Sequence, residues 1–376
     1  MPHEQMDRSK LKILPLAARL NKVRIERDAV QPDAVPRPLG EAGARVMAET
    51  LTRIREARAA GRPVMLAFGA HTIKNGLAPV LIRLMERGWL THLATNGAGI
   101  IHDWEFAFQG MSSEDVRGYV SQGQFGIWEE TGRYLNLALV VGAWRGLGYG
   151  ESVGAMIQDQ GLEIPTVAAL REDILEEIGA AGDERLATGS PSRAAAAADL
   201  LEVVQRFQLA PGRMAIPHAG IAYSAQAAAY RMGVPFTGHP MIGHDIIYTH
   251  PASHGAAIGR TAQRDFLMYA ANVQRLEGGV YLSIGSAVMS PMIFEKALSM
   301  ARNLEHQAGR RIERHFMVIV DLAQAQWDWQ KDGEPPQDHP AYYLRYCKTF
   351  SRMGGEMRYV SADNRDFLLT LCQQLG

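Results

Sequence analysis

The stretch that decides the fold covers residues 91–103 and reads Thr91-His92-Leu93-Ala94-Thr95-Asn96-Gly97-Ala98-Gly99-Ile100-Ile101-His102-Asp103. Its first half predicts a buried strand, and Gly97 and Gly99 then predict a turn. Glycine tolerates positive φ and lets a backbone approach a ligand closely. In an open α/β sheet, ligands bind outside the carboxyl ends of the strands, where this turn would lie. The stretch therefore predicts an α/β fold and one part of a ligand site.

The segments on either side of this stretch indicate a parallel sheet. Residues 63–69 predict a strand, residues 77–87 a helix and residues 90–94 a second strand, which together make a β-α-β unit. Further strands are expected at 214–217, 234–236, 279–285, 315–321 and 357–360. Helices are expected at 222–232, 266–276, 291–303 and 363–374, and over most of the Ala- and Glu-rich segment 151–210.

This alternation predicts the fold class: an α/β protein with a doubly wound, mainly parallel Rossmann-like sheet and helices on both faces. Residues 1–60 are expected to form an N-terminal arm followed by a helix at 41–60. The arm reads either as an oligomer-wrapping segment or as a partly disordered leader. Residues 61–376 are expected to form a single α/β domain, because no Pro-, Gly- or Ser-rich linker divides them.

Composition narrows the function classes. The chain has 376 residues, 47% of them hydrophobic and 21% charged, as in ordinary globular proteins. The net charge of -1 gives no electrostatic case for binding nucleic acid or an anionic membrane. Only two cysteines occur, Cys347 and Cys372, and no apolar run is long enough to span a bilayer. We therefore expect a cytoplasmic protein without a disulfide framework.

Two strand ends rich in small residues predict niches for an anion or a cofactor. One is Gly69-Ala70-His71-Thr72-Ile73-Lys74-Asn75-Gly76, which leads into a helix whose free N–H groups favour a phosphate. It does not follow GxGxxG, and its glycines could serve the turn alone. The other is Gly285-Ser286, followed by Pro291 near a helix start. Asp321, at the end of a third strand, could contact a ribose or adenine, or cap the next helix.

The residues after the opening turn are titratable. His102 and Asp103 are adjacent, so their side chains point in different directions on a helix or a strand. Asp103 could bind a ribose hydroxyl, orient a histidine, or cap a helix, which is the commonest use of an Asp after a turn. Further on, Ser112-Ser113-Glu114-Asp115 predicts a helix N-terminus.

The densest cluster of titratable residues lies at 239–255. Four of the twelve histidines, His239, His244, His250 and His254, fall within sixteen residues, and Asp245 lies among them. Histidine is suited to proton transfer near neutral pH. A metal site is the competing interpretation, but the spacing is not HExxH and no partner cysteine or carboxylate cluster is near. Some of these histidines are also expected to cap helices or bind backbone.

The order of these motifs resembles the deoxyhypusine synthase-like NAD-binding superfamily over roughly residues 60–372. The resemblance is carried by Gly69–Gly76, by Thr95-Asn96-Gly97-Ala98-Gly99 with Asp103, by the helix from Tyr223 to Pro235, by Gly243–His250 and by Gly285–Ser290. It implies NAD contacts from Ala70, His71, Lys74, Thr95, Asn96, Gly97, Gly99 and Ser286. It also implies an active-site role for His250, with Asp245 near the acidic loop position, and a homo-oligomer, either a tetramer or a dimer.

The sequence departs from the synthase at its reactive groups. The position of the synthase's nucleophilic lysine is Met289 here, and the next lysine is Lys296, inside the following helix. The acidic pair after the glycine turn is replaced by Ile101 and His102. An enzyme that forms an imine with its own lysine is therefore not expected, and neither is deoxyhypusine synthase activity.

Three hypotheses of function follow. The first is an NAD-dependent enzyme that abstracts hydride from a small polar metabolite, with elimination or transfer as a possible next step. An amine or amino acid is favoured as substrate by the resemblance alone. In this hypothesis His250 is the general base or acid, and His244, His102 and Asp245 assist it, while Gly285 and Asp321 help to bind the cofactor. The second is a metal-dependent hydrolase or lyase that uses the 239–254 cluster. The third is a non-catalytic NAD-binding protein.

Overall fold

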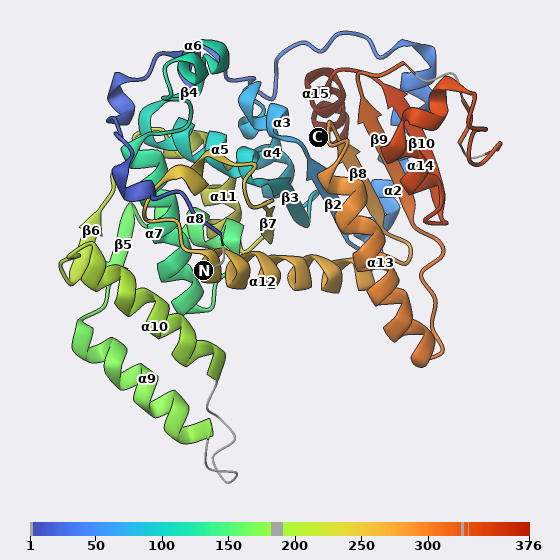
Figure 1. Ribbon diagram of the computed structural model, residues 1–376. Coiled ribbons are helices and arrows are strands. Elements are labelled where there is room, and N and C mark those ends of the chain that lie inside the picture. The colour runs from blue at the N-terminus through green and yellow to red at the C-terminus, as the bar shows by residue number, and fades with distance from the viewer. Residues whose placement is uncertain (1–2, 182–190, 325–326, 330) are drawn as a thin grey trace.

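The computed structural model describes residues 3–181, 191–324, 327–329 and 331–376 (Figure 1). Its centre is a six-stranded parallel sheet with the lateral order β10-β9-β8-β2-β3-β7. The strands are β2 (Val64–Phe68), β3 (His92–Asn96), β7 (Phe236–His239), β8 (Val280–Ile284), β9 (Phe316–Asp321) and β10 (Glu356–Ser361). All five strand pairs are parallel, so the carboxyl ends of all six strands lie on one edge.

Both faces of the sheet are buried, which explains why its strands are apolar at successive positions. In β2, the side chains of Val64, Leu66 and Phe68 join the core on one face. Met65 and Ala67, which point the other way, join a second core on the opposite face. Side chains alternate between the two sides of a strand, so a strand covered on both sides needs apolar residues throughout.

Helices supply the two cores. One face carries α2 (Gly40–Ala59), α4 (Ala78–Glu86) and α15 (Asn364–Leu375). The other carries α12 (Gly255–Gln274), α13 (Met289–Gln307) and α14 (Arg345–Ser351), and α12 and α13 are seen in front of the sheet in Figure 1. Two short helices, α3 (Ala70–Lys74) and η5 (Pro340–Tyr343), complete the connections. The predicted fold class, a doubly wound α/β sheet, is confirmed.

The strand order gives the sheet a point where the direction of winding reverses. Counted along the chain, the six strands lie in the order 6-5-4-1-2-3, the arrangement of doubly wound dinucleotide-binding folds. The reversal lies between β2 and β8, and their carboxyl ends lead to Gly69 and Gly285. A Cβ on Gly69 would collide with the carbonyl oxygen of Gly285, and Gly285 itself has φ +58°. Only glycine therefore fits this contact without strain.

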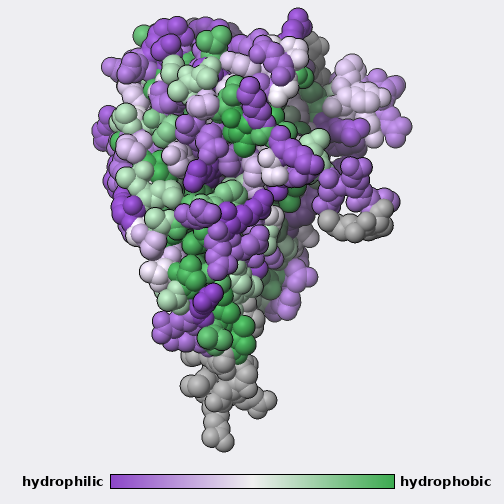
Figure 2. All heavy atoms as spheres, turned by 60° about the vertical axis from the view of Figure 1, so that its left-hand side comes forward, coloured by the Kyte–Doolittle hydropathy of each residue, from purple (hydrophilic) through white to green (hydrophobic). Residues whose placement is uncertain are grey.

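A long insertion between β3 and β7 builds the side of the molecule at the left of Figure 1. Its helices are α5 (Gly97–Gln109), α6 (Val116–Ser121), α7 (Glu129–Arg145), α8 (Tyr149–Gln158), α9 (Val167–Ala181), α10 (Pro191–Arg206), η3 (Ile221–Tyr223) and α11 (Ala225–Met232). Its strands are β4 (Met111–Glu114), β5 (Gly161–Ile164) and β6 (Gly212–Ala215). Helices α9 and α10 pack on each other and extend below the sheet, and apolar side chains lie on this narrow lower part in Figure 2.

The N-terminal arm lies against the insertion. It contains η1 (Arg8–Lys10), η2 (Leu16–Ala18), β1 (Asn21–Arg24) and α1 (Ile25–Asp28). Strand β1 pairs antiparallel with β4, and the backbone N–H of Leu16 donates to the Glu130 carboxylate at 2.6 Å. Residues 16–24 of the arm are therefore held against the insertion of the same chain. Among the described residues, no helix is both long and apolar enough to cross a membrane.

Two local expectations are borne out only in part. The helix N-terminus expected at Ser112-Ser113-Glu114-Asp115 is present, but only Asp115 caps it; residues 111–114 form β4, because the arm provides a partner strand that sequence periodicity does not reveal. Helix α6 begins only after Asp115, whose side chain accepts from the Gly118 N–H. Residues 212–215 form a strand, but β6 pairs with β5 in a separate antiparallel sheet instead of the central one.

One buried carboxyl group joins three elements next to the sheet. Asp265 of α12 is fully buried, and its Oδ2 accepts from the N–H of Gly150 in α8 at 2.9 Å and of Gly238 in β7 at 2.6 Å. Its Oδ1 has no hydrogen-bond partner among the described residues. Burial raises the pKa of Asp265 to about 8, while the two N–H groups partly oppose this shift.

This pKa predicts how stability depends on pH. Between pH 4 and 8 the folded protein keeps a proton on Asp265 that the unfolded chain releases, so the contribution of Asp265 to the free energy of unfolding falls as pH rises, by about 1.4 kcal/mol per pH unit. Asp265→Asn, an isosteric neutral replacement, should remove this contribution, so the variant should gain stability relative to the wild type at pH 8 but not at pH 4. Urea unfolding at both values measures it, with exposed Asp33→Asn as control. An unchanged slope in Asp265→Asn would contradict the prediction.

Candidate functional site

A cavity of about 280 Å³ lies beside the amino terminus of α5, near the carboxyl edge of the sheet. Residues from the arm, α3, α5, the β4–α6 region and the loop before η4 (Ile246–Thr249) line it. The lining residues are Arg19, Lys22, Lys74, Ala98, Ile101, His102, Glu105, Ser113, Glu114, Val116, Phe125, His244, Asp245 and Ile246. Four predicted site residues, Lys74, His102, His244 and Asp245, are thus brought together from three separate segments.

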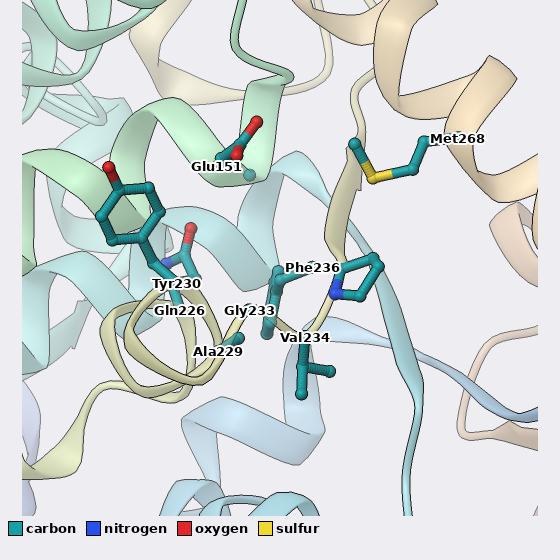
Figure 3. A pocket seen from close by; sticks show the side chains of 10 residues that line it. Glu151, Gln226, Ala229, Tyr230, Gly233, Val234, Phe236 and Met268 are labelled. Atoms are coloured by element: carbon teal, nitrogen blue, oxygen red, sulfur yellow. The ribbon is translucent and has the colours of Figure 1, made fainter.

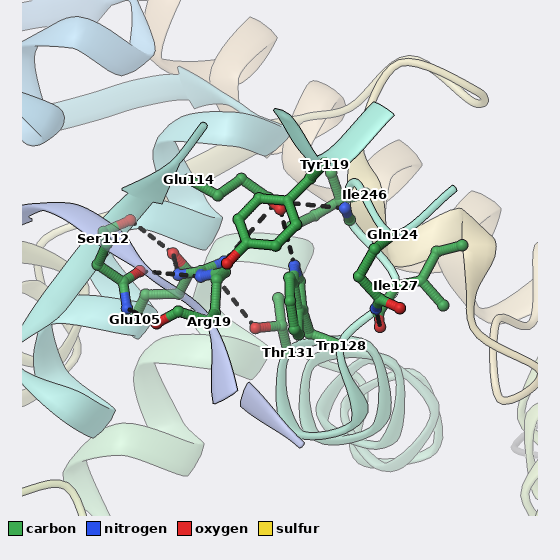
Figure 4. A network of polar contacts seen from close by, with 12 residues as sticks. Arg19, Glu105, Ser112, Glu114, Tyr119, Gln124, Ile127, Trp128, Thr131 and Ile246 are labelled. Atoms are coloured by element: carbon green, nitrogen blue, oxygen red, sulfur yellow. Dashed lines mark hydrogen bonds and ion pairs between the residues drawn. The ribbon is translucent and has the colours of Figure 1, made fainter. Parts of the chain in front are cut away.

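A network of buried charges forms the floor of this cavity (Figure 4). Arg19 donates to both carboxylate oxygens of Glu105 at 2.7 Å, and each side chain is 1% exposed. Glu105 also accepts from the hydroxyls of Ser112 at 2.5 Å and Thr131 at 3.1 Å. The second carboxylate, Glu114, lies 3.9 Å from Arg19. Such a pair is favourable only when its remaining polar atoms are satisfied, and here they are.

Glu114 is held by the segment that precedes α7. The indole N–H of Trp128 donates to Oε2 of Glu114 at 2.9 Å, and the backbone N–H of Gly126 donates to Oε1 at 3.2 Å. Burial raises the pKa of the Glu114 carboxyl, and the Trp128 hydrogen bond and the Arg19 charge oppose this. The floor therefore carries one cation and two carboxyl groups, all held by several hydrogen bonds.

His102 lies at the edge of this floor. Its Nδ1 is 2.7 Å from the Ser112 hydroxyl, and helix α5 places Glu105 three residues further on the same side. Burial lowers the pKa of His102 to about 4, with Glu105 opposing this shift and Lys74, Arg19 and His71 adding to it. At neutral pH the imidazole is therefore uncharged, and one of its two nitrogens carries no proton.

Asp245 and Lys74 give the cavity two charges of opposite sign. The Asp245 carboxylate packs over Gly97 at the amino terminus of α5, where any side chain in place of Gly97 would collide with it. Burial raises the pKa of Asp245 to about 6, while a hydrogen bond from Tyr248 lowers it. The Tyr248 hydroxyl is 3.4 Å away, which is a weak contact. Lys74 has no ion-pair partner among the described residues.

The predicted cofactor residues lie at the carboxyl ends of four neighbouring strands. Gly69, Ala70 and His71 follow β2, Asn96 and Gly97 end β3 and begin α5, Gly285 and Ser286 follow β8, and Asp321 ends β9. His71 is exposed, and Ala70, Gly285 and Asp321 are half-buried. The expectation that these strand ends share one edge of the sheet is thus confirmed, while their contact with a cofactor stays a prediction.

Several of these residues already have partners within the chain. Thr95 is fully buried, donates to the Phe68 carbonyl at 2.9 Å and packs against Gly99. Asn96 caps α5 by accepting from the Gly99 N–H at 3.0 Å. The Ser286 hydroxyl accepts from the Ser290 N–H at 3.1 Å. Among them, Thr95 has no surface to offer a ligand.

Asp103 has a structural role that excludes the expected cofactor contact. It is fully buried, and its carboxylate accepts from the Ser224 hydroxyl, from the N–H groups of Ala225 and Gln226, and from the Gln226 amide. These donors belong to the start of α11. The capping alternative is thus correct, although the capped helix is distant in sequence rather than the next one.

The histidine cluster is dispersed. His250 lies outside the residues that line the cavity, with its Nε2 3.2 Å from Glu129 of α7 and its Nδ1 accepting from the Ala252 N–H. His239 is buried with its Nε2 2.9 Å from the Thr237 hydroxyl, and His254 caps α12. Only His244 reaches the cavity. Within the described residues, no three His, Cys, Asp or Glu side chains are placed to hold a metal ion.

A second cavity of about 240 Å³ lies at the amino end of β7 (Figure 3). Its lining is mainly apolar and includes Ala229, Val234, Phe236 and Met268, with Glu151 and Tyr230 at one side. It contains none of the predicted site residues and lies away from the carboxyl edge of the sheet. The cavity beside α5 is therefore the better candidate.

Comparison with known proteins gives remote structural matches. No family model matches the chain, and no curated protein does. The complex of AgrE with ornithine and NAD+ is 15% identical over 89% of this chain and 33% of that chain, with a TM-score of 0.42. A putative LOR/SDH protein from Methanococcus maripaludis S2 is 11% identical over 92% of this chain and 72% of that chain, with a TM-score of 0.42. ArgZ, a cyanobacterial arginine dihydrolase, is 13% identical over 88% of this chain and 32% of that chain, with a TM-score of 0.39.

The chain therefore spans about a third of the AgrE and ArgZ chains. Sequence reasoning missed Arg19, Glu105, Ser112 and Glu114. The spacing of His102 and Glu105 by three residues on one helix was the available signal for Glu105. Nothing in the sequence indicated that Arg19 of the arm would pair with it.

The capping role of Asp103 predicts a loss of stability rather than of ligand binding. Asp103→Ala leaves several buried donors unsatisfied and should lower the free energy of unfolding by about 3 kcal/mol. The matched control is Asp115→Ala, which removes the exposed cap of α6 and should cost about 1 kcal/mol. Urea unfolding measures both. An Asp103→Ala protein of unchanged stability that no longer retains NAD would instead support the ribose contact.

Proposed function

We propose that this chain is an NAD-dependent enzyme that oxidises a small zwitterionic metabolite, such as an α-amino acid. The observation that carries the proposal is the meeting of Lys74, His102 and Asp245 in one cavity beside the glycine-lined edge of the sheet. This arrangement combines an unpaired cation, a neutral base and a carboxylate. Membership of the deoxyhypusine synthase-like superfamily is part of the same proposal, without the synthase activity.

The cofactor part of the proposal is supported by the strand order and by the Gly69–Gly285 contact. In doubly wound sheets the crevice at the winding reversal is where dinucleotides bind. Ala70, His71, Gly285 and Ser286 flank this point, and the exposed Val288 offers an apolar surface for a ring. When bound, NAD+ supplies an acceptor for hydride. Asp321 is placed one strand further along, where it can bind a hydroxyl group.

The substrate class follows from the charges that line the cavity. We assign the substrate carboxylate to the Lys74 ammonium and its amino group to the Asp245 carboxylate, because neither side chain has a strong partner of its own. Opposite charges at separate points of a partly enclosed cavity bind a zwitterion in one orientation. The volume of about 280 Å³ suits a molecule the size of an amino acid.

His102 is assigned the role of general base in place of His250. It lines the cavity, and its uncharged ring has one nitrogen without a proton, which can accept the proton that an amine or hydroxyl group must lose on oxidation. His250 is bound to Glu129 and holds the loop before α12 on α7, so it acts on the fold of this loop. His244 is exposed at the cavity rim and can contact the substrate.

The two other hypotheses make different predictions. A metal-dependent hydrolase needs ligands that converge, and the histidines at 239, 244, 250 and 254 do not. A non-catalytic NAD-binding protein would bind NAD without turnover and would not need His102. A homo-oligomer, dimer or tetramer, stays a prediction, and the exposed Leu175 and Ile178 of α9 are apolar surface that it could cover.

The cofactor and the base are tested together. Purified protein should gain thermal stability with NAD+, and an amino-acid screen with reduced NAD formation as readout should find a substrate. His102→Ala should lower kcat by about 100-fold or more, whereas His250→Ala should lower it far less. Exposed Lys10→Met serves as control. No thermal shift at saturating NAD+ would disprove the cofactor, and a shift without turnover on any metabolite would favour the non-catalytic protein.

The proposed substrate contact predicts a pH dependence. Asp245 has a pKa of about 6, so it loses its charge as pH falls through this value, and kcat/KM should decline below pH 6. The acidic limb should be absent in Asp245→Asn, whose KM should be raised above pH 6 and should approach the wild-type value below it, where Asp245 is itself neutral. A limb at the same pH in Asp245→Asn would show that another group causes it.

A further inference from the structure

The donors and acceptors around Ser112 determine which nitrogen of His102 carries the proton. Glu105 forms a two-pronged ion pair with Arg19 in a buried site, so it is ionised and can only accept hydrogen bonds. The Ser112 hydroxyl lies 2.5 Å from Oε2 of Glu105 and must donate its single proton there. Its oxygen is then an acceptor toward Nδ1 of His102, 2.7 Å away.

We infer that Ser112 is a positioning residue that fixes His102 as the Nδ1–H tautomer and so leaves Nε2 as the unprotonated nitrogen that faces the ligand. The neutral imidazole has one N–H group, and the Ser112 oxygen accepts its hydrogen bond. No described residue is hydrogen-bonded to Nε2, and it is not among the buried polar atoms without a partner. The role of Nε2 as a base rests on the proposed function, whereas the tautomer follows from the hydrogen bonds alone.

The position of Ser112 is fixed by the pairing of two strands and by burial. Ser112 is fully buried in β4, where it pairs with Val23 of β1 in the arm. Glu105 is clamped by Arg19 of the same arm and by the Thr131 hydroxyl of α7. The line His102–Ser112–Glu105–Arg19 therefore joins the cavity to a residue that lies close to the amino terminus in sequence.

The arrangement suits a base. When Nε2 takes a proton from the substrate, the bond from substrate to hydrogen breaks and the electron pair stays on the substrate, while the imidazole becomes a cation. Both of its nitrogens then carry protons, and Nδ1–H still donates to Ser112. The Glu105 carboxylate lies behind Ser112 and stabilises the new positive charge. The opposite tautomer would present an N–H to the substrate, and a histidine of that kind cannot act as the base.

The tautomer can be observed in the resting protein by nitrogen-15 NMR of histidine side chains, with His102 identified by the signal that His102→Gln removes. We expect a protonated Nδ1 and a bare Nε2 in the wild type and in Ser112→Thr. In Ser112→Ala the signal should shift toward the other tautomer or a mixture. Once His102→Gln has identified the signal, a wild-type spectrum with the proton on Nε2 would overturn the inference even if the Ser112 variants failed to fold.

Kinetics provide the second readout. Ser112→Ala should lower kcat by about 10- to 100-fold with little change in KM, and Ser112→Thr should restore most of it. The matched control is Ser121→Ala, which removes an exposed serine of α6. Equal kcat in Ser112→Ala and wild type would contradict the positioning role. If NAD+ fails to bind while the spectrum shows Nδ1–H, the proposed function fails and the tautomer assignment stands.

Discussion

The buried ion pair between Arg19 and Glu105 is the interaction on which the candidate site depends. It joins the N-terminal arm to α5, and through Ser112 and Thr131 it also binds β4 and α7. Burying two charges costs free energy unless their remaining polar atoms are hydrogen-bonded. The hydroxyl groups of Ser112 and Thr131 therefore belong to the same unit as the ion pair. Because this unit forms the floor of the cavity, the cavity exists only where the arm meets the segment that runs from α5 to α7.

The central sheet could be predicted because its causes are local. Its strands are covered on both faces and read as short apolar runs, and glycine or a polar residue follows several of them, as at Gly69 and Gly285. The positions of the neighbouring helices follow from their apolar periodicity. Strand β4 escaped prediction for a physical reason. Its partner β1 is about ninety residues away in sequence, and the pairing leaves no mark on the residues of β4 themselves.

The candidate site was predicted only in part, and the errors have one origin. A titratable residue near a strand end can face a ligand or the protein interior, and sequence alone does not distinguish the two. Asp103 faces the start of α11, and His250 faces Glu129, whereas the adjacent His102 and the nearby Asp245 face the cavity. The partner that decides each case, Ser224 or Glu129 or Ser112, lies elsewhere in the chain.

The position of Arg19 in the arm has a thermodynamic consequence. Docking of the arm completes the cavity and so strengthens the binding of any ligand there by some free energy. By linkage, the bound ligand must stabilise the docked arm by the same free energy. Arm and ligand are thus reciprocally linked, although they need not touch. Amide hydrogen exchange in β1 would slow in proportion to ligand occupancy, which makes the backbone of the first strand a reporter for a site whose chemistry is carried by other segments.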